Sequence, residues 1–306
     1  MRLHRHARAG GHPGWRVLQG WIPAFAGMTV MACASAPPVA TVQRTALPAQ
    51  RATILPRDVQ QGALIVGTTD PAARVEFANR QVRVSPDGVF AIGIARDAPA
   101  SVVVAVTQPG TSRTEHRIAV APRDVPVERI VGVPPETVRP SPAIAARIER
   151  EQAAVAAERT RDDARTDFAH GFRWPVEGRV SGRFGNRRTY VLPDGTDVPQ
   201  TPHSGMDIAA KTGTPVRAPA AGVVTFANDA LYLTGGTLLL DHGHGVSSNF
   251  LHLSRIDVKV GDHVEQGQVL GAVGATGRAS GPHLHWGMNW FEVRVDPLLV
   301  LGGDAK

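Results

Sequence analysis

The segment GPHLHWGMNW (residues 281–290) combines two histidines with large apolar residues. In a β-strand alternate side chains point to the same face, so His283 and His285 are expected to face one side of a sheet together. Trp286 and Trp290 follow with the same period, which favours packing in a core over a place in the wall of a groove. Two imidazoles side by side suit metal binding or proton transfer, but one such pair is weak evidence.

Two more segments carry side chains of the same chemistry. The first is HSGMD (residues 203–207), in which His203 and Asp207 lie four residues apart, and Gly205 between them favours an extended turn over a helix. The second is SNFLHL (residues 248–253), a β-like segment that contains His252. Of the twelve histidines in the chain, seven lie between His203 and His285, which makes this region the chemically informative one.

Four histidines and one aspartate are enough for a catalytic zinc site. Such a site takes about three protein ligands and keeps one position open, which leaves two histidines to spare. The helical HExxH motif with its glutamate base is absent, so acid–base work would fall on the spare histidines. His242 and His244 also have the spacing of ligands, but the glycines around them predict a tight hairpin and a structural or exposed role.

The motifs HSGMD, FLHLS and GPHLHW together resemble those of the lysostaphin/LytM-type zinc metallopeptidases. The surrounding stretches FRWPVEGRVSGRFG, GTPVRAPAAGVV and VKVGDHVEQGQVLGAVGATGRASGPHLHW are similar as well, so the resemblance covers about residues 171–302. It implies an antiparallel β-sheet groove and one Zn²⁺ per chain, held by His203, Asp207 and His285. It also implies that His252 and His283 act on water and the transition state. All five positions are filled here.

The resemblance implies a zinc-dependent metalloendopeptidase that hydrolyses peptide bonds of peptidoglycan, in cross-links or stem peptides, for cell-wall remodelling. The alternative is a non-catalytic LytM-like domain that binds and activates a cell-wall amidase, although such proteins lose zinc ligands. A biotinyl or lipoyl carrier would need a lysine presented on a hairpin, and neither Lys211 nor Lys259 has that setting. The bond cleaved, the identity of the general base, the protein partners and the oligomeric state stay open.

The expected fold class is mainly β. Short β-branched runs separated by turn residues predict a small immunoglobulin-like β-sandwich at residues 54–121. Residues 122–170 read as a Pro-rich linker and a helix, with Ser141 as N-cap, Pro142 in the first turn and Gly171 as its end. An antiparallel β-sheet peptidase domain is expected at residues 171–302.

One long segment within the peptidase domain is expected to be a loop. It runs from Asn186 to Thr201, has Pro-Asp-Gly at residues 193–195, and leads directly to His203. Long loops beside a site usually shape what binds there, so we expect this one to form a groove wall that selects the stem peptide.

The first residues predict export. Residues 1–32 read as a leader or signal segment and residues 33–53 as a flexible tether. Cys33 follows Val-Met-Ala, which resembles a bacterial lipobox, so a lipid-anchored protein and a cleaved soluble one are both compatible with export. A start at Met28 or Met31 is a third alternative. Because peptidoglycan lies outside the cytoplasm, we expect the periplasm or the cell envelope.

Charge and cysteine content exclude other classes. The formal net charge is +6, but four arginines and no acidic residue precede Cys33, and without that leader the charge falls to +2. Nucleic-acid binding is therefore not expected. A single cysteine permits neither an internal disulfide nor a Cys-rich zinc site.

Overall fold

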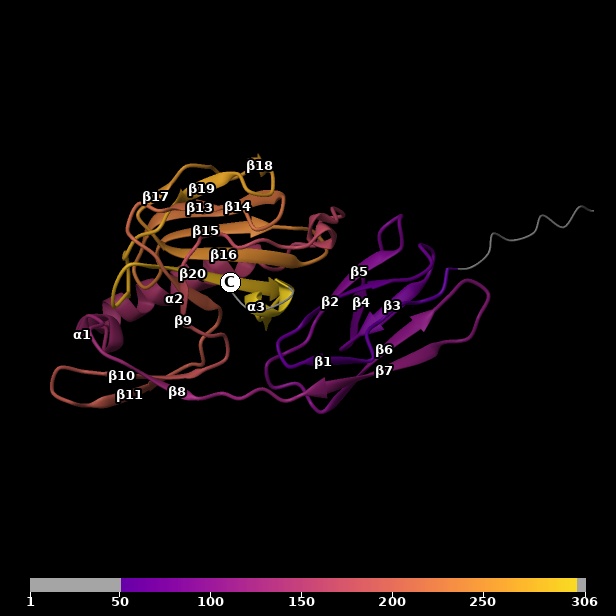
Figure 1. Ribbon diagram of the computed structural model, residues 1–306, viewed down its shortest axis with the longest axis horizontal. Coiled ribbons are helices and arrows are strands. Elements are labelled where there is room, and N and C mark those ends of the chain that lie inside the picture. Colours follow the sequence, from indigo (N-terminus) through magenta and orange to yellow (C-terminus); the bar gives the residue numbers. More distant parts are fainter. Residues whose placement is uncertain (1–50, 302–306) are drawn as a thin grey trace, which may run out of the picture. The chain divides into compact units, whose positions relative to one another are not determined.

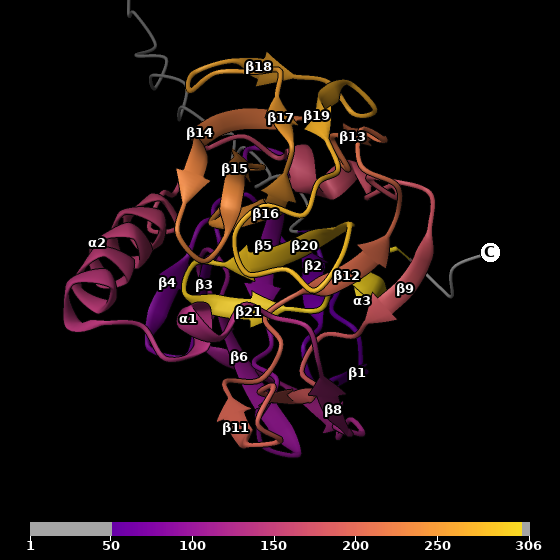
Figure 2. The same cartoon turned by 90° about the vertical axis from the view of Figure 1, so that its left-hand side faces the viewer.

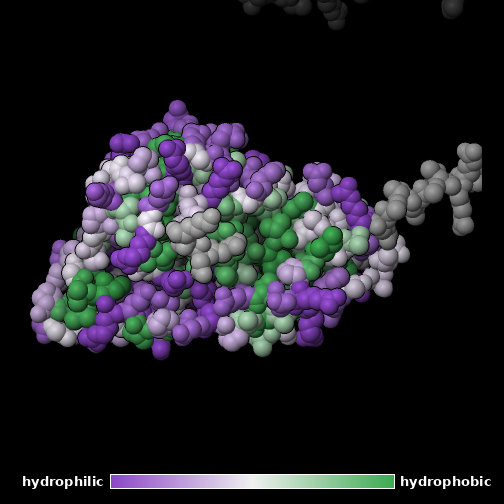
Figure 3. All heavy atoms as spheres, viewed as in Figure 1, coloured by the Kyte–Doolittle hydropathy of each residue, from purple (hydrophilic) through white to green (hydrophobic). Residues whose placement is uncertain are grey.

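The computed structural model describes residues 51–301, and the prediction of a mainly β fold is confirmed. Cys33 and the predicted leader lie outside the described residues. No helix between residues 51 and 301 is both long and apolar enough to cross a membrane. On the face shown in Figure 3, hydrophilic side chains cover much of the surface and hydrophobic ones lie between them.

The upstream part consists of short strands in two sheets (indigo to magenta in Figure 1). The strands are β1 (Asp58–Gln60), β2 (Leu64–Thr68), β3 (Arg74–Phe77), β4 (Arg80–Val82), β5 (Val89–Gly93), β6 (Ser101–Thr107) and β7 (Thr114–Ala121). One sheet has the order β1-β7-β6-β3-β4, and β2 pairs with β5. Val75, Phe90 and Ile92 are fully buried, as the β-branched and aromatic residues of a β core usually are.

A helix follows, and its start agrees with the sequence. The elements here are β8 (Val127–Ile130), α1 (Pro135–Val138), α2 (Pro142–Glu158) and the 3₁₀ turn η1 (Asp167–His170). Ser141 is the N-cap of α2, where its hydroxyl accepts a hydrogen bond from the backbone N–H of Ile144 at 3.4 Å.

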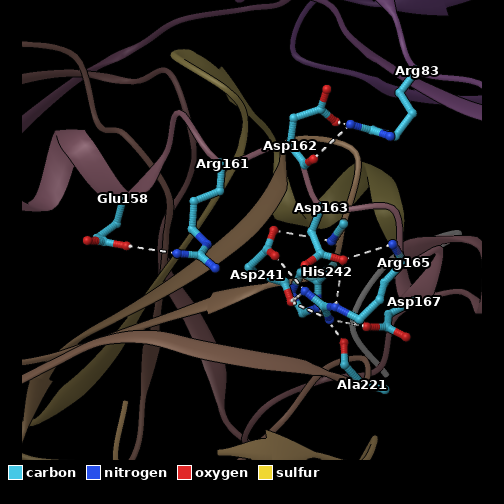
Figure 4. Close-up of polar contacts among 11 residues, drawn as sticks. Arg83, Glu158, Arg161, Asp162, Asp163, Arg165, Asp167, Ala221, Asp241 and His242 are labelled. Atoms are coloured by element: carbon cyan, nitrogen blue, oxygen red, sulfur yellow. Dashed lines mark hydrogen bonds and ion pairs between the residues drawn. The ribbon is translucent and has the colours of Figure 1, made fainter. Parts of the chain in front are cut away.

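The predicted end of this helix at Gly171 is wrong, since α2 ends at Glu158. The following segment is held instead by side chains: Arg165 donates hydrogen bonds to Asp163, Asp167 and Asp241, and so joins the segment to the large sheet (Figure 4). Gly171 ends η1 rather than α2, with a φ of 81° that suits glycine.

The downstream part is built on an eight-stranded sheet with the path β18-β14-β15-β16-β20-β12-β9, and β21 pairs with β20. The remaining elements are β9 (Arg179–Gly182), β10 (Arg187–Val191), β11 (Asp197–Gln200), β12 (Met206–Ala209), β13 (Pro215–Arg217), β14 (Gly222–Leu231), β15 (Gly235–Asp241), β16 (Val246–Leu253), β17 (Arg255–Ile256), β18 (His263–Val264), β19 (Val269–Ala272), β20 (His283–Trp290), β21 (Val293–Val295) and α3 (Pro297–Val300). Every pairing within this sheet is antiparallel, as predicted.

Alternate side chains of β20 lie on two faces of the sheet, one in the core and the other at the predicted site. Leu284, Trp286 and Met288 on one face are fully buried, and Trp290 is 2% exposed, so core packing of the tryptophans is confirmed. His283 and His285 belong to the alternate set of positions. Figure 2 shows α2 beside the ends of β14 and β15, where Arg147 donates a hydrogen bond to the carbonyl of Ala230 at 2.7 Å.

The predicted loop between Asn186 and Thr201 is largely a β-hairpin. Strands β10 and β11 are antiparallel, and Gly195, with a φ of 82°, lies in the turn between them. Strand β8 adds to β10 in parallel, with Glu128 opposite Arg188. The prediction failed because β8 lies about sixty residues earlier, so no local pattern reveals the partner that stabilises this hairpin.

Candidate active site

Neighbouring strands bring the five predicted site residues together. Asp207 on β12 lies directly opposite His285 on β20, and His285 lies opposite Leu251 on β16, next to His252. His203 precedes β12 by three residues. All five line one cavity of about 500 Å³, whose walls also include residues of α2, of the β10–β11 hairpin and of the segment before β20.

Three of these side chains converge within hydrogen-bonding distance of one another. His203 Nε2 lies 3.0 Å from His285 Nδ1 and 3.1 Å from Asp207 Oδ1, and His285 Nδ1 lies 2.9 Å from the same oxygen. All three residues are buried. Within the part of the chain that the structure describes, they form the one group of three or more His, Cys, Asp or Glu residues that can hold a metal ion.

The donor atoms fit a metal ion. His203 Nδ1 lies 3.0 Å from the carbonyl oxygen of Arg183 and 3.1 Å from the guanidinium of Arg188, so Nε2 is the ring nitrogen that faces the cluster. Together with His285 Nδ1 and Asp207 Oδ1 it forms a set of two nitrogens and one oxygen, which is a donor set that zinc takes. Ligand atoms about 2.0–2.1 Å from a tetrahedral zinc lie roughly 3.3 Å apart. The observed 2.9–3.1 Å is close to that separation.

Asp207 stays ionised despite its burial. Burial opposes its charge, but the nearby His203 and His285 outweigh this and hold the pKa of the carboxyl well below its usual range. Arg188 on β10 donates to the second oxygen, Asp207 Oδ2, and also to Glu128 on β8. The sequence prediction missed Arg188 and Glu128, because the hairpin that carries Arg188 was interpreted as a loop.

Two glycines allow this close packing. A Cβ on Gly205 would lie 2.7 Å from the His285 ring and 2.6 Å from the backbone oxygen of Trp286. A Cβ on Gly182 would lie 2.5 Å from the Arg188 guanidinium and 2.7 Å from Asp207 Oδ2. The glycine within HSGMD therefore has a packing role that the motif alone does not reveal.

His252 and His283 lie side by side next to this cluster, with ring centroids 4.8 Å apart. His252 Nδ1 donates to the carbonyl of Thr276 at 2.7 Å, and His283 Nδ1 donates to that of Gly281 at 2.8 Å. In both rings Nε2 is thus the nitrogen that remains free of the backbone. Burial, assisted by the neighbouring His283, lowers the pKa of His252 to about 4.

His242 and His244 lie outside the cavity. His242 is fully buried between the carbonyl of Ala221 at 2.7 Å and the hydroxyl of Ser248 at 2.8 Å, and burial lowers its pKa to about 4. His244 packs on Phe168, with ring centroids 5.2 Å apart. The structural alternative of the sequence prediction is therefore the correct one for this hairpin.

Residues 201–297 match the sequence model of peptidase family M23. A solved structure of a Pseudomonas aeruginosa protein assigned to the M23 peptidases is 33% identical, with a TM-score of 0.59, over 79% of this chain and 94% of that one. The chain belongs to peptidase family M23. This confirms the resemblance drawn from the motifs. The structural similarity to the Pseudomonas aeruginosa protein extends beyond residues 201–297, because it covers 79% of this chain.

Curated relatives with named activities match the same region. The peptidoglycan DD-endopeptidase ShyA of Vibrio cholerae is 39% identical over 116 residues, which is 37% of this chain and 26% of that protein. The DD-carboxypeptidase/endopeptidase Mpg of Neisseria meningitidis is 41% identical over 126 residues, which is 41% of this chain and 27% of that protein. The matched segments thus span about a quarter of the length of these relatives.

Proposed function

We propose that this M23 protein is a zinc-dependent endopeptidase that hydrolyses peptide bonds of peptidoglycan. One zinc ion would be held by His203, Asp207 and His285. The observation that carries the proposal is the convergence of these three buried donor atoms, within 3.1 Å of one another, at a cavity that two more histidines line. Zinc, when bound, lowers the pKa of a water ligand and polarises a substrate carbonyl.

His252 and His283 would carry the proton transfers. Each ring has its Nδ1 proton bound by a backbone carbonyl, so Nε2 is the atom available to the substrate. One of the two takes a proton from the attacking water and later donates it to the leaving amine. The other donates a hydrogen bond to the oxyanion that develops on the scissile carbonyl, which requires its protonated form.

The substrate class is inferred from the relatives. ShyA is named as a peptidoglycan DD-endopeptidase and Mpg as a DD-carboxypeptidase/endopeptidase, and both match the region that carries the site. The cavity volume of about 500 Å³ is adequate for part of an extended peptide. The rival proposal, an inactive activator of an amidase, has less support because all five site positions keep their side chains.

Digestion of isolated sacculi tests the function. Purified protein supplied with zinc should release fragments that mass spectrometry identifies as products of peptide-bond cleavage in cross-links or stems. The bond between glycan and peptide should stay intact, since its cleavage would indicate an amidase. Undigested sacculi, with a zinc-loaded and folded protein, would contradict the proposal and favour the activator.

Export follows from this function, since the substrate lies outside the cytoplasm. We propose a periplasmic or envelope location, with lipid anchoring through Cys33 as one form of it and a soluble protein as the other. Membrane fractionation of the wild type and of Cys33→Ser separates them. An anchored protein leaves the membrane fraction when Cys33 is replaced. Equal amounts of both proteins in the soluble fraction would exclude the anchor.

A further inference from the structure

Two arginines line the same cavity away from the metal cluster. Arg159 is the C-cap residue of α2, and Arg294 lies in the middle of β21. Burial lowers the pKa of Arg159 to about 9, assisted by the positive charge of Arg294, and burial lowers the pKa of Arg294 to about 10. Both side chains line the same cavity, which is the geometric relation between them.

Neither arginine has an acidic partner. Among residues 51–301, no carboxylate oxygen lies within 4.0 Å of either guanidinium. The Nε atom of Arg159 is buried and has no hydrogen-bond partner, and Arg294 donates to the amide oxygen of Asn289 at 3.0 Å. Glu151 also lines the cavity, but it already accepts hydrogen bonds from Arg147 and from the backbone N–H of Tyr232.

The charged residues of the whole cavity also favour an anionic ligand. Its lining includes four arginines, which are Arg159, Arg188, Arg278 and Arg294, and two carboxylates, Glu151 and Asp207. Arg188 is paired with Asp207 and Glu128, while Arg278 contacts the carbonyl of Thr137 and the ring of Tyr190. Withdrawing cations from water without a counterion is costly, so a pair of this kind is suited to an anionic ligand.

Strand β20 connects the metal cluster with the arginine pair. Asn289 lies four residues beyond His285 in the same alternating set, so the two are separated by about 13 Å along the strand. Between them Gly287 has no side chain, and a Cβ there would lie 2.5 Å from Asn249 Oδ1. This oxygen is buried without a hydrogen-bond partner, and Asn249 lines the cavity. It offers an acceptor for an N–H group of an extended ligand.

We propose that Arg159 and Arg294 form a carboxylate-binding subsite of the cavity. The subsite takes a free carboxylate of a peptide whose scissile bond lies at the metal cluster, about four extended residues away. Guanidinium groups are well suited to this, since they donate two parallel hydrogen bonds to a carboxylate. The nature of the peptide rests on the proposed function, whereas the binding of a carboxylate rests on the two arginines.

Binding of a non-hydrolysable peptide to the zinc-loaded protein tests the subsite without hydrolysis. The probes are a synthetic stem-type hexapeptide with free carboxylates, whose bond at the cleavage position is replaced by a non-hydrolysable one, and the same peptide with every carboxylate amidated; calorimetry gives both Kd values. The wild type should bind the acid form about 10-fold to 100-fold more tightly, the range expected for charge-assisted hydrogen bonds. Arg159→Gln and Arg294→Gln should each reduce that ratio, and the double variant should bring it near one.

Arg150→Gln is the matched control, because Arg150 lies on the exposed side of the same helix. It should keep the wild-type ratio, and thermal melting should show that all variants fold. Equal binding of the two peptides by the wild type, or an unchanged ratio in the double variant, would overturn the subsite. Sacculi that are digested while the ratio is one would reject the subsite alone. A high ratio without digestion would reject the proposed function alone.

Discussion

The upstream sheets and the eight-stranded sheet are built from similar β-forming residues but differ in what they bury. Within residues 51–121, the buried polar side chains are Thr69 and Ser85, and each has a hydrogen-bond partner nearby. The large sheet and the segment that leads into β12 bury His203, Asp207 and His285 at one place. Burying ionisable groups is costly, so their concentration in one sheet identifies the part of the molecule that carries chemistry.

Loss of the spare histidines should affect activity most while preserving the metal. His252→Ala and His283→Ala should each reduce hydrolysis by about 100-fold or more, as expected for a lost acid–base group. Neither His252 nor His283 supplies one of the three converging donor atoms, so zinc content should stay close to one per chain. Hydrolysis assays and metal analysis on the same preparations check this. A folded but metal-free variant would make that histidine a ligand.

Removal of Arg188 should have a smaller effect, on metal affinity. Arg188 orients Asp207 through its second oxygen, so Arg188→Gln should weaken zinc binding by about 10-fold to 100-fold. Competition with a chelator measures the change. Arg187→Gln is the control, because Arg187 is the adjacent exposed residue of β10. An unchanged zinc affinity in Arg188→Gln would mean that the ion pair does not support the site.

The same comparison shows what the sequence could predict. Features with a local signal were placed well: Ser141 is the N-cap of α2, and His283 and His285 lie on one strand as the alternation implies. Features that depend on distant partners were missed. The segment after α2 is held to the large sheet by the contact of Arg165 with Asp241, and the position of Arg188 depends on the pairing of β10 with β8. Neither partner is visible in the local pattern.

The β10–β11 hairpin should tune substrate preference rather than catalysis. Tyr190 and Gln200 from this hairpin line the cavity on the side of His203. Replacing residues 191–198 by a two-residue turn should therefore change KM or the profile of released fragments more than it changes zinc content. Fragment analysis of digested sacculi and metal analysis make the comparison. An identical digest profile would count against a role in selection.

A core substitution in the upstream sheets should have the smallest effect on the site. Phe90 is fully buried, so Phe90→Ala should lower the free energy of unfolding by about 3–5 kcal/mol. Urea unfolding measures this loss. The kcat/KM of the folded fraction and its zinc content should stay near those of the wild type. Loss of zinc from the folded variant would show that the two regions are coupled.

The metal content of His285→Ala tests the central claim most directly. We predict that purified wild-type protein binds one zinc per chain, and that His285→Ala binds none while it keeps its fold by circular dichroism. His263→Ala, at an exposed histidine of β18, should keep the full amount. Stoichiometric zinc in folded His285→Ala would contradict the assignment of His203, Asp207 and His285 as the metal site.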